Sequence, residues 1–155
     1  MNNVEKDFCL DFTKKLIKCE LSIPFVHPVD RNADYAPAYF RIIDHPMDLT
    51  TVKTKIIDGK YKSSNEWHAD INLIWKNAVT FNKKPSPIYY VADFLQKKCD
   101  RHLAKIPKTK QDLLLMKLEK VNNKMTKLLA FDMAEHSSVL KVDPKLLQAN
   151  TFSSL

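Results

Sequence analysis

One asparagine stands out in this chain as a candidate for binding chemistry. Asn82 directly follows Phe81 and precedes a loop that contains Pro85 and Pro87. An asparagine side chain offers a hydrogen-bond donor and an acceptor without carrying charge. At the end of a helix such a residue is most often a cap or turn residue. Its neighbourhood decides whether Asn82 also contacts a ligand.

The segment 23–49 is the second chemically informative feature. It lies between two segments with helical spacing, and compact helical proteins usually join their helices with about 2–8 residues. The chain has 8 prolines, and 10% of its residues are aromatic. This segment holds an unusual share of both: Pro24, Pro28, Pro37, Pro46, Tyr35, Tyr39 and Phe40. A long connection that is stiffened by proline and rich in aromatic rings favours a binding loop.

The two features predict a cleft with defined chemistry if successive helices alternate in direction. In that case the segment 23–49 and the loop after Asn82 emerge at the same end of the helical bundle. Asn82 would face an apolar wall built from Pro24, Phe25, Val29, Ala36 and Tyr39. Such a cleft suits a neutral, elongated ligand with one carbonyl group. It rejects a bare ammonium, because burial of an unpaired charge is costly. Acetylation of lysine removes that charge, so the cleft should separate acetylated from unmodified lysine.

Hydrophobic periodicity predicts the helices that position these residues. A first helix over about 3–22 is indicated by residues that recur every three or four positions: Val4, Phe8, Phe12, Leu16 and Cys19. Pro24 should end it. A short second helix over about 49–58 is expected to stop at Gly59, which suits a helix C-terminus.

Two further helices follow the same reasoning. Ser63 and Glu66 match a capping box ahead of a helix over 64–81. Ser86 is expected to cap a fourth helix, which has Pro87 at its first position and reaches about residue 106. The predicted fold is all-α: an antiparallel four-helix bundle over 1–106, with a long loop between helices one and two.

Residues 107–155 are expected to form a C-terminal extension with a loosely ordered tail. A fifth amphipathic helix over about 110–131 is indicated by a four, three, four, three repeat: Leu114, Leu118, Val121, Met125 and Leu128. Two interpretations stay open for this apolar stripe. It packs back onto the bundle, or it mediates self-association or contact with a partner protein; a monomer is the simpler expectation.

Composition narrows the class of protein. A chain of 155 residues with 45% hydrophobic content can form one core. No apolar run approaches the length of a membrane span, and the N-terminus lacks a signal-peptide core, so we expect a soluble, non-secreted protein. Cys9, Cys19 and Cys99 are widely spaced, which predicts core thiols and neither disulfides nor a metal site. We expect no metal and no cofactor.

Two other functional classes are alternatives to binding of a neutral ligand. The net charge of +7 permits a basic helical module that binds DNA, although the charge is spread along the chain and no helix-turn-helix is recognisable. An enzyme is not expected, because the histidines are scattered and no H-E-x-x-H, G-x-S-x-G or P-loop pattern occurs. The scattered residues are His27, His45, His68, His102 and His136.

The sequence resembles the bromodomain family over about residues 5–106. The match rests on short runs in the family's order and spacing: Pro24-Phe25, Pro28-Val29-Asp30, Pro37-Ala38-Tyr39-Phe40, Ile43, Pro46-Met47-Asp48-Leu49 and Phe81-Asn82. By this resemblance Asn82 would donate a hydrogen bond to the acetyl carbonyl, and Tyr39 would reach the same carbonyl through water. The remaining expected cavity residues are Pro24, Phe25, Val29, Ala36, Phe81 and, as gatekeeper, Ile88.

The loop departs from the family at several positions. Ile23 precedes Pro24 where bromodomains of the BET group have tryptophan, and Ala38 replaces the more usual aspartate. Asp34 and Ala36 stand where bulkier apolar residues are common in that group. We expect a wider and more polar outer mouth, with the chemistry of Asn82 and Tyr39 preserved.

The resemblance implies a nuclear reader of acetylated lysine on protein tails, with histone tails as the expected targets. Four aspartates oppose Arg31 and Arg41 in the loop and would favour a lysine-rich tail: Asp30, Asp34, Asp44 and Asp48. Exposed charges of this kind contribute little, roughly 0–1 kcal/mol per pair. On the facing loop, Lys83 and Lys84 either offset this negative charge locally or make weak contact with DNA. A further alternative is a docking scaffold that has the same fold and does not bind acetyl-lysine.

Overall fold

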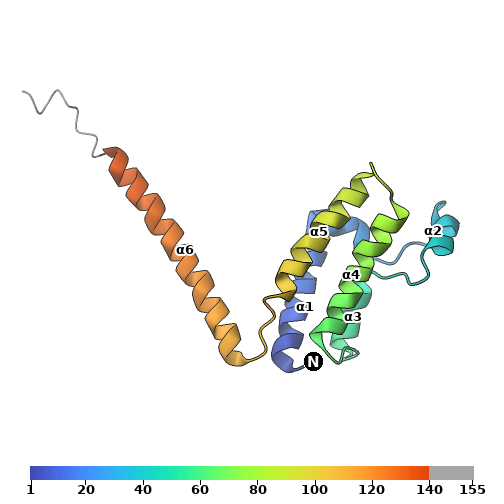
Figure 1. Cartoon of the computed structure of the whole chain (residues 1–155), viewed down its shortest axis with the longest axis horizontal. Helices are drawn as coiled ribbons and strands as arrows, with labels where there is room; N and C mark the ends of the chain where they lie inside the picture. Colours follow the sequence, from blue (N-terminus) through green and yellow to red (C-terminus); the bar gives the residue numbers. More distant parts are fainter. Residues whose placement is uncertain (140–155) are drawn as a thin grey trace, which may run out of the picture. The chain divides into compact units, whose positions relative to one another are not determined.

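The computed structural model describes residues 1–139, in which every regular element is a helix and no strand occurs. The helices are α1 (Asn3–Ile17), the 3-10 helix η1 (Glu20–Phe25), α2 (Ala36–Ile42), α3 (Leu49–Ile57), α4 (Ser64–Phe81), α5 (Pro87–Leu103) and α6 (Lys110–Val139). The chain divides into one compact unit over Met1–Lys110 and a second over Gln111–Leu155. In the first unit α1, α3, α4 and α5 form the four-helix bundle, and α2 lies in the long loop (Figure 1).

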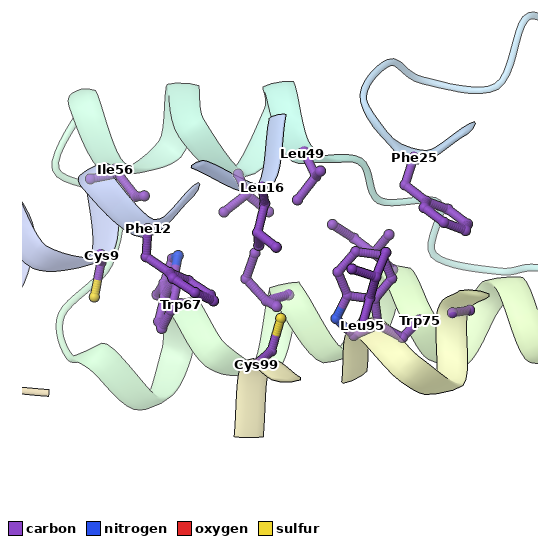
Figure 2. Packing of buried hydrophobic residues seen from close by; sticks show 14 of the residues in the cluster. Cys9, Phe12, Leu16, Phe25, Leu49, Ile56, Trp67, Trp75, Leu95 and Cys99 are labelled. Atoms are coloured by element: carbon purple, nitrogen blue, oxygen red, sulfur yellow. The ribbon is translucent and has the colours of Figure 1, made fainter. Parts of the chain in front are cut away.

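The core of the bundle is built around two tryptophans on α4. Trp67 is fully buried, meets the ring of Phe12 edge-on at 6.0 Å, and donates from Nε1 to Thr13 Oγ1 at 3.1 Å. Trp75 meets Phe25 edge-on at 5.2 Å. Figure 2 shows these rings between α1, α3 and α5. Because Phe25 ends η1, this packing joins the start of the long loop directly to the core.

The predicted first helix is too long. The α-helix ends at Ile17, and residues 20–25 form a 3-10 helix instead. Pro24 lies inside this segment, lacks an N–H, and its ring crowds an α-helical turn before it. Shorter-range bonds replace the α pattern: Ser22 donates its backbone N–H to Cys19 O at 2.8 Å.

The other predicted helix boundaries lie closer to those in the structure. The helix over 64–81 is confirmed, and α3 starts at the predicted Leu49 and ends one residue early, at Ile57. The fourth helix ends at Leu103 instead of 106, and α2 was missed inside the predicted loop. A seven-residue helix spans too few turns to produce a clear periodic pattern.

The helix caps agree only in part with prediction. Ser63 Oγ accepts the backbone N–H of Glu66 at 3.3 Å, but the Glu66 carboxylate accepts from Lys62 N, so the box is not reciprocal. Ser86 makes no side-chain cap hydrogen bond, although Pro87 does begin α5. Gly59 has the positive φ of 66° that was expected after α3. Asn2 and Glu5 form a full capping box at α1, which was not predicted.

The described part of the second unit is helical. The predicted helix over 110–131 is present and extends to Val139. The interpretations of its apolar stripe stay predictions, and the predicted loose tail from 140 onward lies outside the described residues. Within residues 1–139 no helix is both long and apolar enough to cross a membrane.

Asp48 caps α3 at the junction between the long loop and the bundle. It is 5% exposed, accepts the Thr51 backbone N–H at 2.8 Å, and also accepts from the hydroxyls of Thr50 and Thr51. We expect Asp48→Ala to lower the free energy of unfolding by about 1–2 kcal/mol, measured by urea denaturation. Asp58→Ala, at the exposed other end of α3, is the matched control. Equal stability of the two variants would contradict the capping role.

Buried thiols predict that the fold weakens at alkaline pH. Burial is the main cause that raises the pKa of Cys9 and of Cys99, each to about 12. The thiols stay protonated in the folded state and ionise near pH 8.5 when the chain unfolds. The contribution of the two thiols to the free energy of unfolding is therefore complete below about pH 8.5 and is lost as the pH rises toward 12.

The expected result is a melting temperature that falls steadily from pH 8.5 to pH 10.5. In Cys9→Ala with Cys99→Ala the fall should be shallower, and Cys19→Ala, at a less buried position, should follow the unmodified protein. Thermal melts at constant ionic strength measure it. Identical pH profiles for the double variant and the unmodified protein would refute this origin.

Candidate functional site

A cavity of about 450 Å³ opens where η1, the long loop, α4 and α5 meet. Its volume falls within the usual range for small-molecule sites. The lining residues are mostly apolar or aromatic: Pro24, Phe25, His27, Val29, Tyr35, Tyr39, Met47, Ile74, Ala78, Phe81, Asn82 and Ile88. No carboxylate is among them, so the cavity has no negative side chain with which to neutralise a cation.

Seven of the eight predicted cavity residues line this cavity: Pro24, Phe25, Val29, Tyr39, Phe81, Asn82 and Ile88. The eighth, Ala36, does not line the cavity. It is 1% exposed at the first position of α2, where its small side chain is covered by its neighbours. Tyr35, the residue before it, reaches the cavity instead.

Sequence reasoning missed five lining residues. Ile74 and Ala78 precede Asn82 by eight and four positions on α4, so helical spacing could have placed them on the same side. Met47 belongs to the Pro46-Met47-Asp48-Leu49 run that was singled out for the resemblance. For His27 and Tyr35 the sequence carries no comparable signal, because both lie in the irregular part of the loop.

Asn82 both ends α4 and lines the cavity. Its backbone N–H donates to Ala78 O at 2.8 Å, and its side-chain Nδ2 donates to the same carbonyl at 3.1 Å. The predicted cap role and the predicted cavity role are thus combined in one residue. A primary amide carries two N–H groups and a carbonyl oxygen. One N–H holds the side chain in place, which leaves the other N–H and Oδ1 for a ligand.

Tyr39 supplies a second polar group from α2. The residue is 7% exposed, and its ring meets Phe81 edge-on at 5.2 Å. Burial raises its pKa, and the nearby Asp48 and Tyr35 raise it further. The hydroxyl therefore remains a neutral phenol that can donate a hydrogen bond at neutral pH.

Two long-range hydrogen bonds hold the loop against the bundle. Asn77, on α4 and 7% exposed, donates from Nδ2 to His45 O at 2.8 Å. The backbone N–H of Thr50 donates to Val26 O at 3.0 Å. These bonds connect both ends of the loop to regular structure, so they position Met47 and Val29 in the wall. Neither contact was predicted.

The charge of the cavity rim differs from the prediction. Asp48 is a buried helix cap, so it does not contribute to an exposed acidic rim. Asp30, Asp34 and Asp44 remain exposed. On the facing loop Lys84 lies over the Tyr89 ring at 5.4 Å. Among the described residues no group of three His, Cys, Asp or Glu side chains is placed to hold a metal ion.

Proteins from other organisms match part of this chain. The chain is 42% identical over 89 residues to transcription factor GTE11 of Arabidopsis thaliana, which covers 57% of this chain and 14% of the relative. It is 34% identical over 98 residues to the SWR1 complex bromodomain subunit bdf1 of Schizosaccharomyces pombe, with 61% and 17% covered. The chain thus spans less than a fifth of the length of these relatives.

Solved structures give the same match. The second bromodomain of Candida albicans Bdf1, bound to an imidazopyridine, superposes with a TM-score of 0.60 at 28% identity. The superposition covers 65% of this chain and 98% of that one. The sequence profile of the family described as Bromodomain matches residues 9–93, which include the loop, α4 and the start of α5. The matched residues carry the cavity and Asn82, and this chain belongs to the bromodomain family.

Proposed function

We propose that this protein binds N6-acetyl-lysine on protein tails and acts as a chromatin reader module. The observation that supports this proposal most is the way in which the Asn82 side-chain amide is held at the cavity wall. One amide N–H is held by Ala78 O, and the rest of the amide lines an apolar cavity of about 450 Å³. An acetyl carbonyl accepts the free N–H, and the methyl and methylene groups of the ligand contact the apolar wall.

Selection against unmodified lysine follows from the composition of the wall. An ammonium group that enters the cavity loses water and meets no carboxylate among the lining residues. The lost solvation is costly when no partner replaces it. Acetylation removes the charge, and the Tyr39 hydroxyl then supports the carbonyl through a bridging water.

Histone tails in the nucleus are the proposed targets. Exposed Asp30, Asp34 and Asp44 around the loop favour a lysine-rich tail. The names of the relatives, a transcription factor and an SWR1 complex subunit, are consistent with this setting. Because the cavity takes one side chain, we expect a dissociation constant on the order of tens to hundreds of micromolar.

Calorimetric titration with matched histone-tail peptides tests the proposal. An acetylated peptide should bind in the expected range, and the same peptide without the acetyl group should show no measurable heat. Equal affinity for both peptides would refute acetyl-lysine recognition. Binding of a partner protein without any acetyl-lysine binding would favour the docking scaffold instead.

A further inference from the structure

The outer side of α5 carries aromatic rings and cations in one line. Tyr90, Phe94, Lys98 and Arg101 follow one another on α5 at intervals of four, four and three residues, which is the spacing of a single helix face. Lys105 lies in the turn directly after the helix. Tyr90 and Phe94 are 53% and 50% exposed. We call these five residues the α5 stripe. From Tyr90 to Arg101 the stripe is roughly 17 Å long at the usual helical rise.

A neighbouring helix adds another cation to the stripe. His102 of α5 stacks on Phe12 of α1, with ring centroids 4.3 Å apart. Lys15, Lys98 and Lys105 all lie close enough to His102 to act on its charge. In the described part of the chain none of these three lysines forms an ion pair. Three cations thus gather around one histidine with no carboxylate paired to them.

We propose that the α5 stripe together with Lys15 binds single-stranded nucleic acid. Lysine and arginine contact phosphate oxygens without reading sequence. Exposed aromatic rings stack on unpaired bases, and the combination of a basic track with such rings is the usual design of single-strand sites. A duplex keeps its bases stacked inside, so Tyr90 and Phe94 would find no partner there. The two rings therefore favour a single strand over a duplex.

This surface is distinct from the acetyl-lysine cavity. On α5 the cavity takes Ile88, which packs against the core. The stripe residues are exposed, apart from the half-buried Lys98. Arg101 donates from Nε to Lys97 O at 3.2 Å, which orients its guanidinium and leaves the terminal nitrogens for phosphate. Occupation of the stripe needs no change at Asn82.

His102 provides an independent reporter. Burial is the main cause that lowers its pKa, and Lys98, Lys105 and Lys15 lower it further. A phosphate bound among these lysines would neutralise that effect and raise the pKa of His102. An NMR titration of the histidine ring signals, with and without a saturating oligonucleotide, measures the change. An unchanged His102 would overturn the assignment to this face.

Fluorescence anisotropy with a labelled 20-nucleotide single strand of mixed sequence is the main test. Binding should be tighter than to the 20-base-pair duplex and to heparin. It should weaken roughly 20- to 50-fold between 50 and 200 mM salt, as three or four phosphate contacts imply. Equal or tighter binding of the duplex or of heparin would overturn the single-strand assignment, and no salt-dependent binding would overturn the whole proposal.

Matched variants locate the site on the full chain. Lys15→Gln, Lys98→Gln and Lys105→Gln combined should weaken single-strand binding at least tenfold. The control carries the same change of charge at exposed positions elsewhere on the bundle: Lys60→Gln, Lys62→Gln and Lys76→Gln. Equal losses in the two triple variants would show a general charge effect and refute the site.

The aromatic contribution has its own variant. Tyr90→Ala with Phe94→Ala should weaken single-strand binding by roughly 30-fold or more and leave duplex binding unchanged. Both side chains are exposed, so the fold should tolerate the change. Binding of the acetylated peptide should also be unaffected. A double variant that binds the single strand normally would exclude base stacking on these rings.

Discussion

Replacing Asn82 by alanine is expected to weaken binding of an acetylated peptide by roughly 5- to 150-fold. The variant removes the donor for the acetyl carbonyl, and a buried acceptor left without a partner costs about 1–3 kcal/mol. The apolar wall remains, so the methyl and methylene contacts survive. Calorimetric titration of the same peptide against both proteins measures the loss.

Two controls separate the hydrogen bond from other effects. Asn82→Asp keeps the shape but presents only acceptors when ionised, so it should bind no better than the alanine variant. Asn65→Ala, at an exposed position on α4, should bind normally. Full affinity in a folded Asn82→Ala or Asn82→Asp variant would exclude the proposed role of the amide.

Folding of these variants must be measured alongside binding. The Asn82 side chain also donates to Ala78 O at 3.1 Å, and loss of one such bond lowers the free energy of unfolding by about 0.5–1.5 kcal/mol. We therefore expect a modest fall in melting temperature. A cooperative melt above the titration temperature shows that lost affinity reflects the cavity and not unfolding.

Trp67→Ala should produce the largest loss of stability, about 3–5 kcal/mol. Trp67 is fully buried, packs against Phe12, and donates to Thr13 Oγ1. Alanine leaves a cavity between α1 and α4 that these side chains cannot fill. The expected loss is a large fraction of the roughly 5–15 kcal/mol typical of domains. Urea denaturation followed by circular dichroism measures it.

Trp67→Phe separates packing from hydrogen bonding. The Thr13 hydroxyl keeps its own bond to Cys9 O at 2.8 Å, so loss of the indole N–H leaves no unpaired donor. We expect a smaller loss than for alanine. Tyr90→Ala, at a half-exposed aromatic position, should change stability by less than about 0.5 kcal/mol. If Trp67→Ala were as stable as Tyr90→Ala, the description of the core would be contradicted.

Long helices with buried faces were predictable from the sequence. In α4 the repeat of Trp67, Ile71, Ile74 and Ala78 follows a serine cap, so periodicity and capping agree on the same bounds. In α1 the apolar repeat runs past the true end, because Cys19 keeps the spacing although the backbone has already left the α-helix. Hydrophobic spacing indicates which residues are buried, but it does not indicate whether the backbone there is an α-helix or a 3-10 helix.

The site was predictable where a residue's type carries its chemistry. Asn82 and Tyr39 are polar groups in apolar surroundings, and their types alone suggested hydrogen bonding to a neutral ligand. Ala36 was misplaced because a small apolar residue fits a cavity wall and a helix interior equally well. His27 and Tyr35 were missed because an irregular loop has no period from which to infer direction.

By itself the sequence determined the helical class, the family and the neutral polar chemistry of Asn82, since these depend on residue types and local spacing. Only the tertiary structure decided which loop side chains form the cavity. The loop's path depends on contacts between residues far apart in the chain, such as Asn77 with His45 O and Thr50 N–H with Val26 O. Lys15 lies near the α5 stripe for the same reason, because the stacked rings of Phe12 and His102 bring α1 and α5 together.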